Sequence, residues 1–133
     1  MRSLGMILAF SISFSQVVSA QPGIRNEPVL DEGLFTVGLA HQIRKYCPNI
    51  SPRMFRAIGF LRDLEKTAKD LGYDESEIRR HLDSDVEKER MLERERVYMD
   101  ARGYERTEEG YCALGRAEIA QKSDVGALLR LKK

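Results

Sequence analysis

The sequence predicts an all-α protein, a small four-helix bundle of up-down-up-down topology with a short extra C-terminal helix, after an N-terminal signal peptide. An apolar run at the N-terminus precedes a small-residue cleavage pattern. Apolar residues then recur at helical spacing, and caps, prolines and glycines separate the helical segments. We therefore expect a signal peptide over residues 1–20, an extended leader over 21–29 and one helical domain over 30–133.

The N-terminus indicates export. Met1-Arg2 is a short basic start, the apolar run extends from Leu4 to Val18, and the small residues Ser19 and Ala20 precede Gln21. We expect cleavage between Ala20 and Gln21 and a periplasmic or secreted protein. An uncleaved N-terminal anchor is the alternative and leaves the domain on the same side, although the run is short for crossing a bilayer.

Charge balance argues against nucleic acid as a partner. Removing residues 1–20 removes one basic residue and no acid, which leaves 21 Lys and Arg against 21 Asp and Glu. Proteins that bind nucleic acid through its phosphates usually carry a clear basic excess.

The first two helices are expected to form most of the core. The first, over 30–46, carries two apolar stripes, one with Leu30, Leu34 and Val37 and the other with Phe35, Leu39, Ile43 and Tyr46. Pro48 ends it. Ser51 and Pro52 read as an N-cap and a first helical residue, which predicts a second helix over 52–71 before Gly72.

Cap signals also place the later helices. Asp74 with Glu77 resembles a capping box and opens a third helix that extends to Arg102. Thr107 caps a fourth helix over 108–122, and Ser123-Asp124 caps a final short turn.

The two cysteines, Cys47 and Cys112, fall at the end of the first predicted helix and the start of the fourth. An up-down-up-down bundle brings these positions to the same end of the molecule. In an exported protein this favours a disulfide over a catalytic thiol or a metal ligand, because neither cysteine has a CxxC partner or a histidine at ligand spacing. We expect no metal site and no cofactor.

The histidines are open to two interpretations. His41 continues the Leu30, Leu34 and Val37 stripe, and His81 follows Glu77 by four residues. A hydrogen-bonded rim residue and a helix-surface pair are the simpler interpretations. The alternative is a small envelope enzyme, or a binder of metal or a small molecule, that uses His41 or His81 with nearby carboxylates. No familiar catalytic or nucleotide-binding motif is present, and we therefore do not expect an enzyme.

The charged stretch Glu87–Arg96 includes the apolar residue Met91, and Tyr98 follows two residues after its end. Met91 and Tyr98 point nearly opposite to the other apolar residues of the third predicted helix. They either pack against a neighbouring helix or contact a partner protein.

The segments Ile43–Ser51 and Tyr111–Lys132, which hold both cysteines and the LGRAEI and SDVGALL motifs, resemble a small family of exported alphaproteobacterial proteins of unassigned function. The resemblance implies a signal peptide, a helical domain and no known catalytic residues. It also implies, by association, an accessory role beside a membrane respiratory complex of the NADH–quinone oxidoreductase type. The leading hypothesis is a non-enzymatic periplasmic accessory protein with a protein partner in the envelope and no stable membrane span after signal removal.

The predicted export signal has a direct test. Protein purified from its native envelope should begin at Gln21, because the small residues up to Ala20 fit the signal peptidase. N-terminal sequencing or intact-mass measurement would show this, and an N-terminus at Met1 would establish the anchored alternative.

Overall fold

The computed structural model describes residues 22–133, so the predicted signal peptide and its cleavage site at Ala20 and Gln21 lie outside the described residues. Within this range the chain forms six α-helices, one 3₁₀ turn and two short strands, and the predicted all-α class is confirmed. The elements are η1 (Ile24–Asn26), α1 (Pro28–Tyr46), β1 (Ile50–Pro52), α2 (Met54–Asp70), α3 (Glu75–Asp83), α4 (Asp85–Asp100), α5 (Glu108–Gln121), α6 (Asp124–Ala127) and β2 (Leu129–Leu131).

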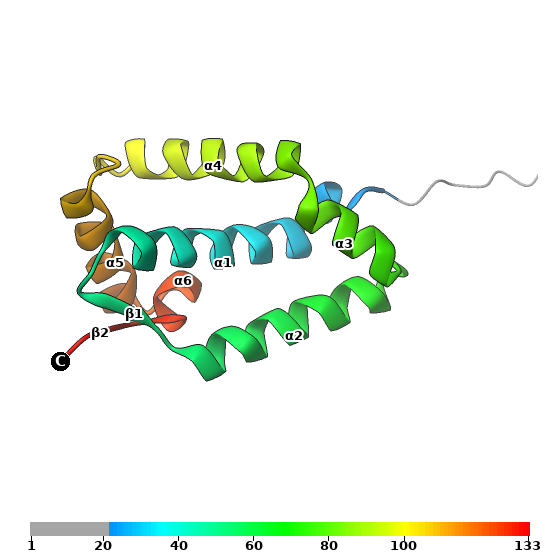
Figure 1. Ribbon diagram of the computed structural model, residues 1–133, viewed down its shortest axis with the longest axis horizontal. Helices are drawn as coiled ribbons and strands as arrows, with labels where there is room; N and C mark the ends of the chain where they lie inside the picture. The colour runs from blue at the N-terminus through cyan, green and yellow to red at the C-terminus, as the bar shows by residue number, and fades with distance from the viewer. Residues whose placement is uncertain (1–21) are drawn as a thin grey trace, which may run out of the picture.

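Helix α1 is the central element of the fold. It packs against α2, α4, α5 and α6, and Figure 1 shows α4, α1 and α2 side by side with α1 in the middle. These three helices alternate in direction, as the predicted up-down-up topology requires. Because α2 and α4 lie on opposite sides of α1, each contacts α1 rather than forming a broad interface with the other.

The fourth long helix, α5, occupies a different place from that of a regular four-helix bundle. Together with α6 it packs on the C-terminal half of α1, at one end of the molecule (Figure 1). Gly115 permits this close approach, because a Cβ atom at this position would collide with the side chains of Ile43 and Ile50. The main core lies here and contains Leu39, Ile43, Met99, Leu114 and Leu129, among others.

A disulfide fixes the same contact. Cys47 follows α1, Cys112 lies near the start of α5, and the two are bonded with their Cα atoms 5.0 Å apart. Both are buried in the main core. The predicted pairing is therefore present in the structure, and no free cysteine remains in the described residues.

The expected start of the second helix is wrong. Ser51 and Pro52 do not cap it but belong to β1, which pairs antiparallel with β2 in the register Ser51 to Arg130. Helix α2 begins at Met54, and its N-cap residue Arg53 makes no side-chain cap bond. Pairing with β2 uses the backbone of Ser51 and Pro52, so these residues cannot adopt helical geometry.

The expected single third helix is also wrong, because the chain divides at Ser84 into α3 and α4. The predicted capping box of Asp74 and Glu77 does open α3. Ser84 then ends α3 in an extended conformation, and its Oγ accepts a hydrogen bond of 3.3 Å from the backbone N–H of Glu87. This serine is thus the N-cap of a new helix.

The segment before the first helix ends earlier than the expected residue 29. It contains η1, and α1 begins at Pro28, where the missing N–H of proline is tolerated in a first turn. Ile24 is buried beside Tyr73, whose hydroxyl donates a hydrogen bond to the carbonyl of Pro22.

Removing the disulfide should destabilise the fold strongly. The double variant Cys47→Ser, Cys112→Ser is expected to lose about 4 kcal/mol of unfolding free energy, because the bond closes a long loop in the unfolded chain. Urea unfolding followed by circular dichroism measures this loss. Reductant should destabilise the wild type equally and leave the double variant unchanged; a wild type indifferent to reductant would contradict the prediction.

Candidate functional site

A groove runs over α1 between α2 and α4. Its floor is one face of α1, formed by Leu34, Val37, Gly38 and His41, and its volume is about 590 Å³. The sequence places Leu34 and Val37 on one of two apolar stripes of this helix. The other stripe, with Leu39 and Ile43, is buried in the main core. On the first stripe Leu30 is buried as well, whereas Leu34 and Val37 are only partly covered.

The groove walls carry apolar side chains that remain accessible to solvent. Helix α4 contributes Met91 and Leu92, α2 contributes Leu61, and α3 contributes Leu82 at one end. The exposed fractions are 44% for Leu61, 50% for Leu82 and 38% for Leu92. Exposed apolar side chains that face one concave surface are typical of interaction sites.

A second pocket continues the groove between α2, α3 and the start of α1. Its volume is about 330 Å³, and it shares Leu34, Leu61, His81 and Leu82 with the groove. Ile24, Leu30, Leu64 and Ile78 add further apolar lining. The two pockets therefore form one apolar surface along α1 from Leu30 to His41, which is about 16 Å at the helical rise per residue.

Polar groups gather toward the other end of the groove. Gln42 and Glu95 line it there, and the Oε1 atom of Gln42 is buried without a hydrogen-bond partner in residues 22–133. Glu95 is buried and accepts a hydrogen bond from the hydroxyl of Tyr111, with the Nε atom of Arg106 at 3.9 Å. A buried acceptor without a donor is costly, so Gln42 is an unfavourable polar group beside the groove.

Both histidines singled out in the sequence line this groove. His41 is exposed, and one of its ring nitrogens, Nδ1, lies 3.2 Å from Nη2 of Arg44. Partial burial, together with the charges of Arg44 and Lys45, lowers the pKa of His41. Burial also lowers the pKa of His81, although the nearby carboxylate of Glu87 opposes the shift. Both imidazoles are thus biased toward the neutral form.

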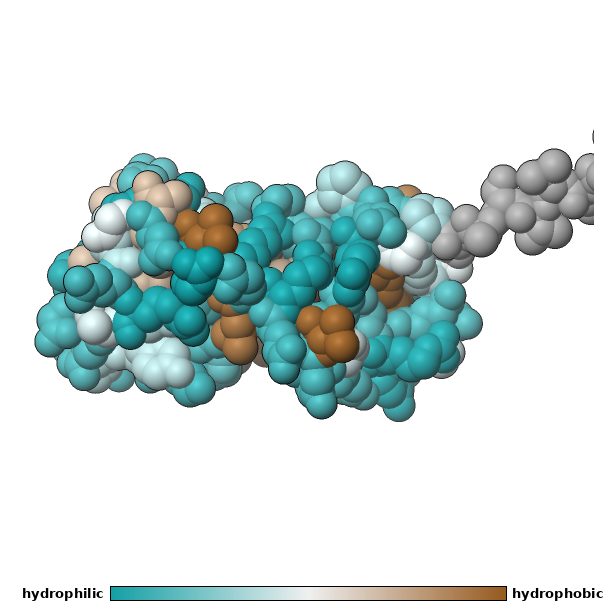
Figure 2. Space-filling model, turned by 90° about the horizontal axis from the view of Figure 1, so that it is seen from above, coloured by the Kyte–Doolittle hydropathy of each residue, from teal (hydrophilic) through white to brown (hydrophobic). Residues whose placement is uncertain are grey.

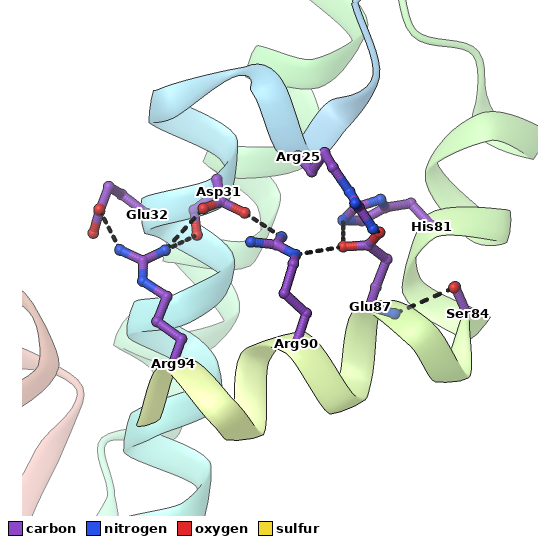
Figure 3. A network of polar contacts seen from close by, with 8 residues as sticks. All are labelled: Arg25, Asp31, Glu32, His81, Ser84, Glu87, Arg90 and Arg94. Carbon is purple, nitrogen blue, oxygen red and sulfur yellow. Dashed lines mark hydrogen bonds and ion pairs between the residues drawn. The ribbon is translucent and has the colours of Figure 1, made fainter. Parts of the chain in front are cut away.

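The described residues contain no group of three or more His, Cys, Asp or Glu side chains that could hold a metal ion. The Nε2 atom of His81 is 4.0 Å from Glu87. The carboxylate of Glu87 is itself held by Arg25 and Arg90 (Figure 3). This carboxylate is therefore already engaged in ion pairs with two arginines.

An ion-pair network fastens α4 to α1 and so positions one wall of the groove (Figure 3). Asp31 of α1 accepts hydrogen bonds from Arg90 and, at 2.9 Å, from Nη1 of Arg94. Arg94 also pairs with Glu32 and lies 4.2 Å over the ring of Phe35. The side chain of Asp31 is only 18% exposed, compared with 66% for Glu32.

Glu87 links the same network to the start of the described chain. It accepts bonds from Nε of Arg25 at 2.8 Å and from Nε of Arg90 at 2.9 Å. Burial on its own would raise the pKa of Glu87, but the two arginines outweigh it and lower the pKa below its usual value. Glu87 therefore stays ionised and keeps α4 close to η1.

The two candidate partner-contact residues have different surroundings. Met91 lines the groove and is half-buried. Tyr98 lies outside the groove lining, where its hydroxyl donates to Glu118 and its ring packs on Phe35 and Arg102. Burial and the Glu118 carboxylate raise the pKa of Tyr98 to about 12. Of the two, Met91 is the residue that faces the candidate site.

The outer face of α4 has a different character from the groove. Seen from above in Figure 2, hydrophilic side chains cover most of this surface and the apolar ones form small separate patches. Among the described residues, no helix has the length and apolar character needed to cross a membrane.

Comparison with known families identifies the relationship of the chain. A family model matches residues 22–130, nearly the whole described range. The chain belongs to DUF5333, a family of unknown function. This confirms the resemblance to a family without an assigned function. The comparisons with curated proteins and with solved structures give no match.

The shielded Asp31 should contribute more to the free energy of unfolding than the exposed Glu32 of the same ion-pair network. Asp31→Asn is expected to lower the unfolding free energy by about 1.5–3 kcal/mol, because two arginines lose a shielded carboxylate. Glu32→Gln, which removes the exposed partner of Arg94, should cost less than about 1 kcal/mol. Urea unfolding of both variants tests this, and equal losses would contradict the assigned role of Asp31.

Proposed function

We propose that this member of the DUF5333 family is an exported, non-enzymatic interaction domain whose groove receives an amphipathic helix of an envelope protein. The observation that carries the proposal is the apolar groove between α2 and α4. The proposed partner is a protein segment rather than nucleic acid or a metal ion.

The groove corresponds to the empty position of a four-helix bundle. α4, α1 and α2 supply three helices, but α5 packs at one end of α1 and does not cover the groove. A fourth helix laid between α2 and α4 would bury the partly covered Leu34 and Val37 of α1. Amphipathic helices bind such grooves through apolar anchors at spacings of three and four residues.

The dimensions of the groove suit a short helical segment. The apolar surface extends along about 16 Å of α1, which is about three helical turns. Leu61, Leu82 and Leu92 lie on its rim, where a bound helix would remove them from water. Gln42 and Glu95 make one end of this lining polar, which distinguishes it from the apolar end at Leu82.

Export is the compartment that the sequence supports, through the predicted signal peptide, and a disulfide is compatible with it. The buried Cys47–Cys112 bond suits an oxidising compartment. An envelope partner follows from that location. A place beside a membrane respiratory complex is the specific setting that the resemblance suggests.

Crosslinking in cells tests the proposed partner site. A photoreactive residue at Leu61 or Met91 should capture one envelope protein, through a segment whose crosslinked residues recur at three- and four-residue spacing. The same residue at Val97, 52% exposed on α4 but outside the groove, should not capture it. Leu92→Glu should abolish the crosslink formed by the photoreactive residue at position 61, because a charge would be placed against the apolar face of the partner.

Two results would overturn this assignment. Equal capture from Val97 and Leu61 would show that the groove is not the contact surface. A crosslink from Leu61 to a second copy of the same chain, with a dimer in light scattering, would make the groove a self-association surface.

The second candidate is a small-molecule binder or envelope enzyme, favoured by one observation: His41 and His81 line the same groove. Native mass spectrometry of protein isolated from the envelope would show a bound small molecule under this hypothesis. His41→Ala and His81→Ala should then release it.

A further inference from the structure

A second surface, separate from the groove lining, lies at the end of the molecule where α2 begins. We propose that this end docks on an anionic lipid bilayer, with Phe55 entering the headgroup region. Figure 1 shows the start of α2, the β1–β2 ribbon, the C-terminal end of α1 and the chain end marked C together at this end of the molecule.

Apolar side chains project from this end into solvent. Phe55 is 93% exposed, Met54 is 56% exposed and Leu131 is 51% exposed. Phe55 and Met54 lie in the first turn of α2, a helix in which only Ala68 is buried. Leu131 belongs to β2, which is hydrogen-bonded to the strand that precedes α2.

Basic residues surround these apolar side chains. Residues 33–62 contain five Lys or Arg and no Asp or Glu, and residues 129–133 contain three more basic residues and no acid. The segments that carry Met54, Phe55 and Leu131 therefore hold basic residues and no acid, although the charge of the whole chain is nearly balanced.

The basic side chains here are not neutralised within the protein. No Asp or Glu side chain in residues 22–133 forms an ion pair with Arg53, Arg56, Arg130 or Lys132. Arg53 donates to the carbonyl of Leu129 and Arg130 to the hydroxyl of Ser51, contacts that leave both charges uncompensated. In contrast, Arg90, Arg94 and Arg96 each hold carboxylates.

An anionic bilayer accounts for both features together. Lipid headgroups supply negative charge to Lys and Arg, and the boundary between headgroups and acyl chains accepts an aromatic side chain. A nucleic-acid duplex would use the positive charge, but its stacked bases offer no apolar phase for the exposed Phe55, Met54 and Leu131. The predicted occupant is therefore a membrane surface, bound peripherally.

The absence of tryptophan from the chain allows a direct test. In the mature oxidised protein, Phe55→Trp should show a blue-shifted fluorescence emission on addition of vesicles of phosphatidylglycerol and phosphatidylcholine. Val86→Trp, at an exposed position on the first turn of α4, should show no shift with the same vesicles.

Cosedimentation with the same vesicles measures affinity. Phe55→Ser should weaken binding roughly tenfold or more, since an apolar ring no longer leaves water. Arg56→Glu should weaken it about fivefold for each unit of charge changed, and added salt should reduce binding. Val86→Ser and Arg80→Glu, which alter exposed residues on other elements, should bind as the wild type does.

Three outcomes would overturn the proposal. These are equal binding to vesicles of phosphatidylcholine alone, an unshifted emission of the Phe55→Trp variant with anionic vesicles, or binding of Phe55→Ser as tight as that of wild type. Binding of an oligonucleotide in the absence of any vesicle binding would assign the basic residues to phosphate backbones instead.

Discussion

The packing of α5 on the C-terminal half of α1 determines the rest of the architecture. Gly115 lets the two helices approach closely, and the Cys47–Cys112 bond fixes the approach covalently. Because α5 is held at one end of α1, it does not fill the space between α2 and α4. The core is therefore concentrated at one end, and an apolar groove remains over the other part of the central helix.

Ion pairs help to hold α4 against α1 beside the groove, whereas apolar packing holds the helices together in the core. Helix α4 fully buries only Glu95 and Met99, and its Met91 and Tyr98 are partly buried against the core. Asp31 and Glu87, both shielded from solvent, add ion pairs with arginines from α4 and from η1. Shielding makes these pairs stronger than the exposed pairs of α2 and α3, whose members are open to water and salt.

Local signals in the sequence predicted much of the fold, whereas contacts between distant segments could not be read from it. The capping box at Asp74, the N-caps at Thr107 and Ser123 and the apolar stripes of α1 depend on neighbouring residues. The helix break at Ser84 had a local signal as well, since Ser84 and Glu87 have capping-box spacing within a charged run. In contrast, β1 pairs with residues about eighty positions away, and Ser51-Pro52 alone resembles a helix start.

In the candidate site, too, local features could be predicted from the sequence and long-range contacts could not. The sequence placed His41 on an apolar stripe, but only the fold brings it to the same groove as His81, Met91 and Leu61. The total charge of the chain is nearly balanced and does not indicate the basic residues around Phe55. The absence of Asp and Glu from residues 33–62 could have indicated them. Tyr98 could be assigned to packing only once Glu118, distant in sequence, was located.

The separate capping of α3 makes one end of the groove a short helix of its own. None of its nine residues is buried. Asp74 begins α3 and Ser84 ends it, so α3 and α4 do not form one continuous helix. Local opening of such a segment costs much less than global unfolding. The end of the groove beside Leu82 therefore rests on partly buried contacts such as that of Ile78, whereas the disulfide at the other end of α1 lies in the buried core.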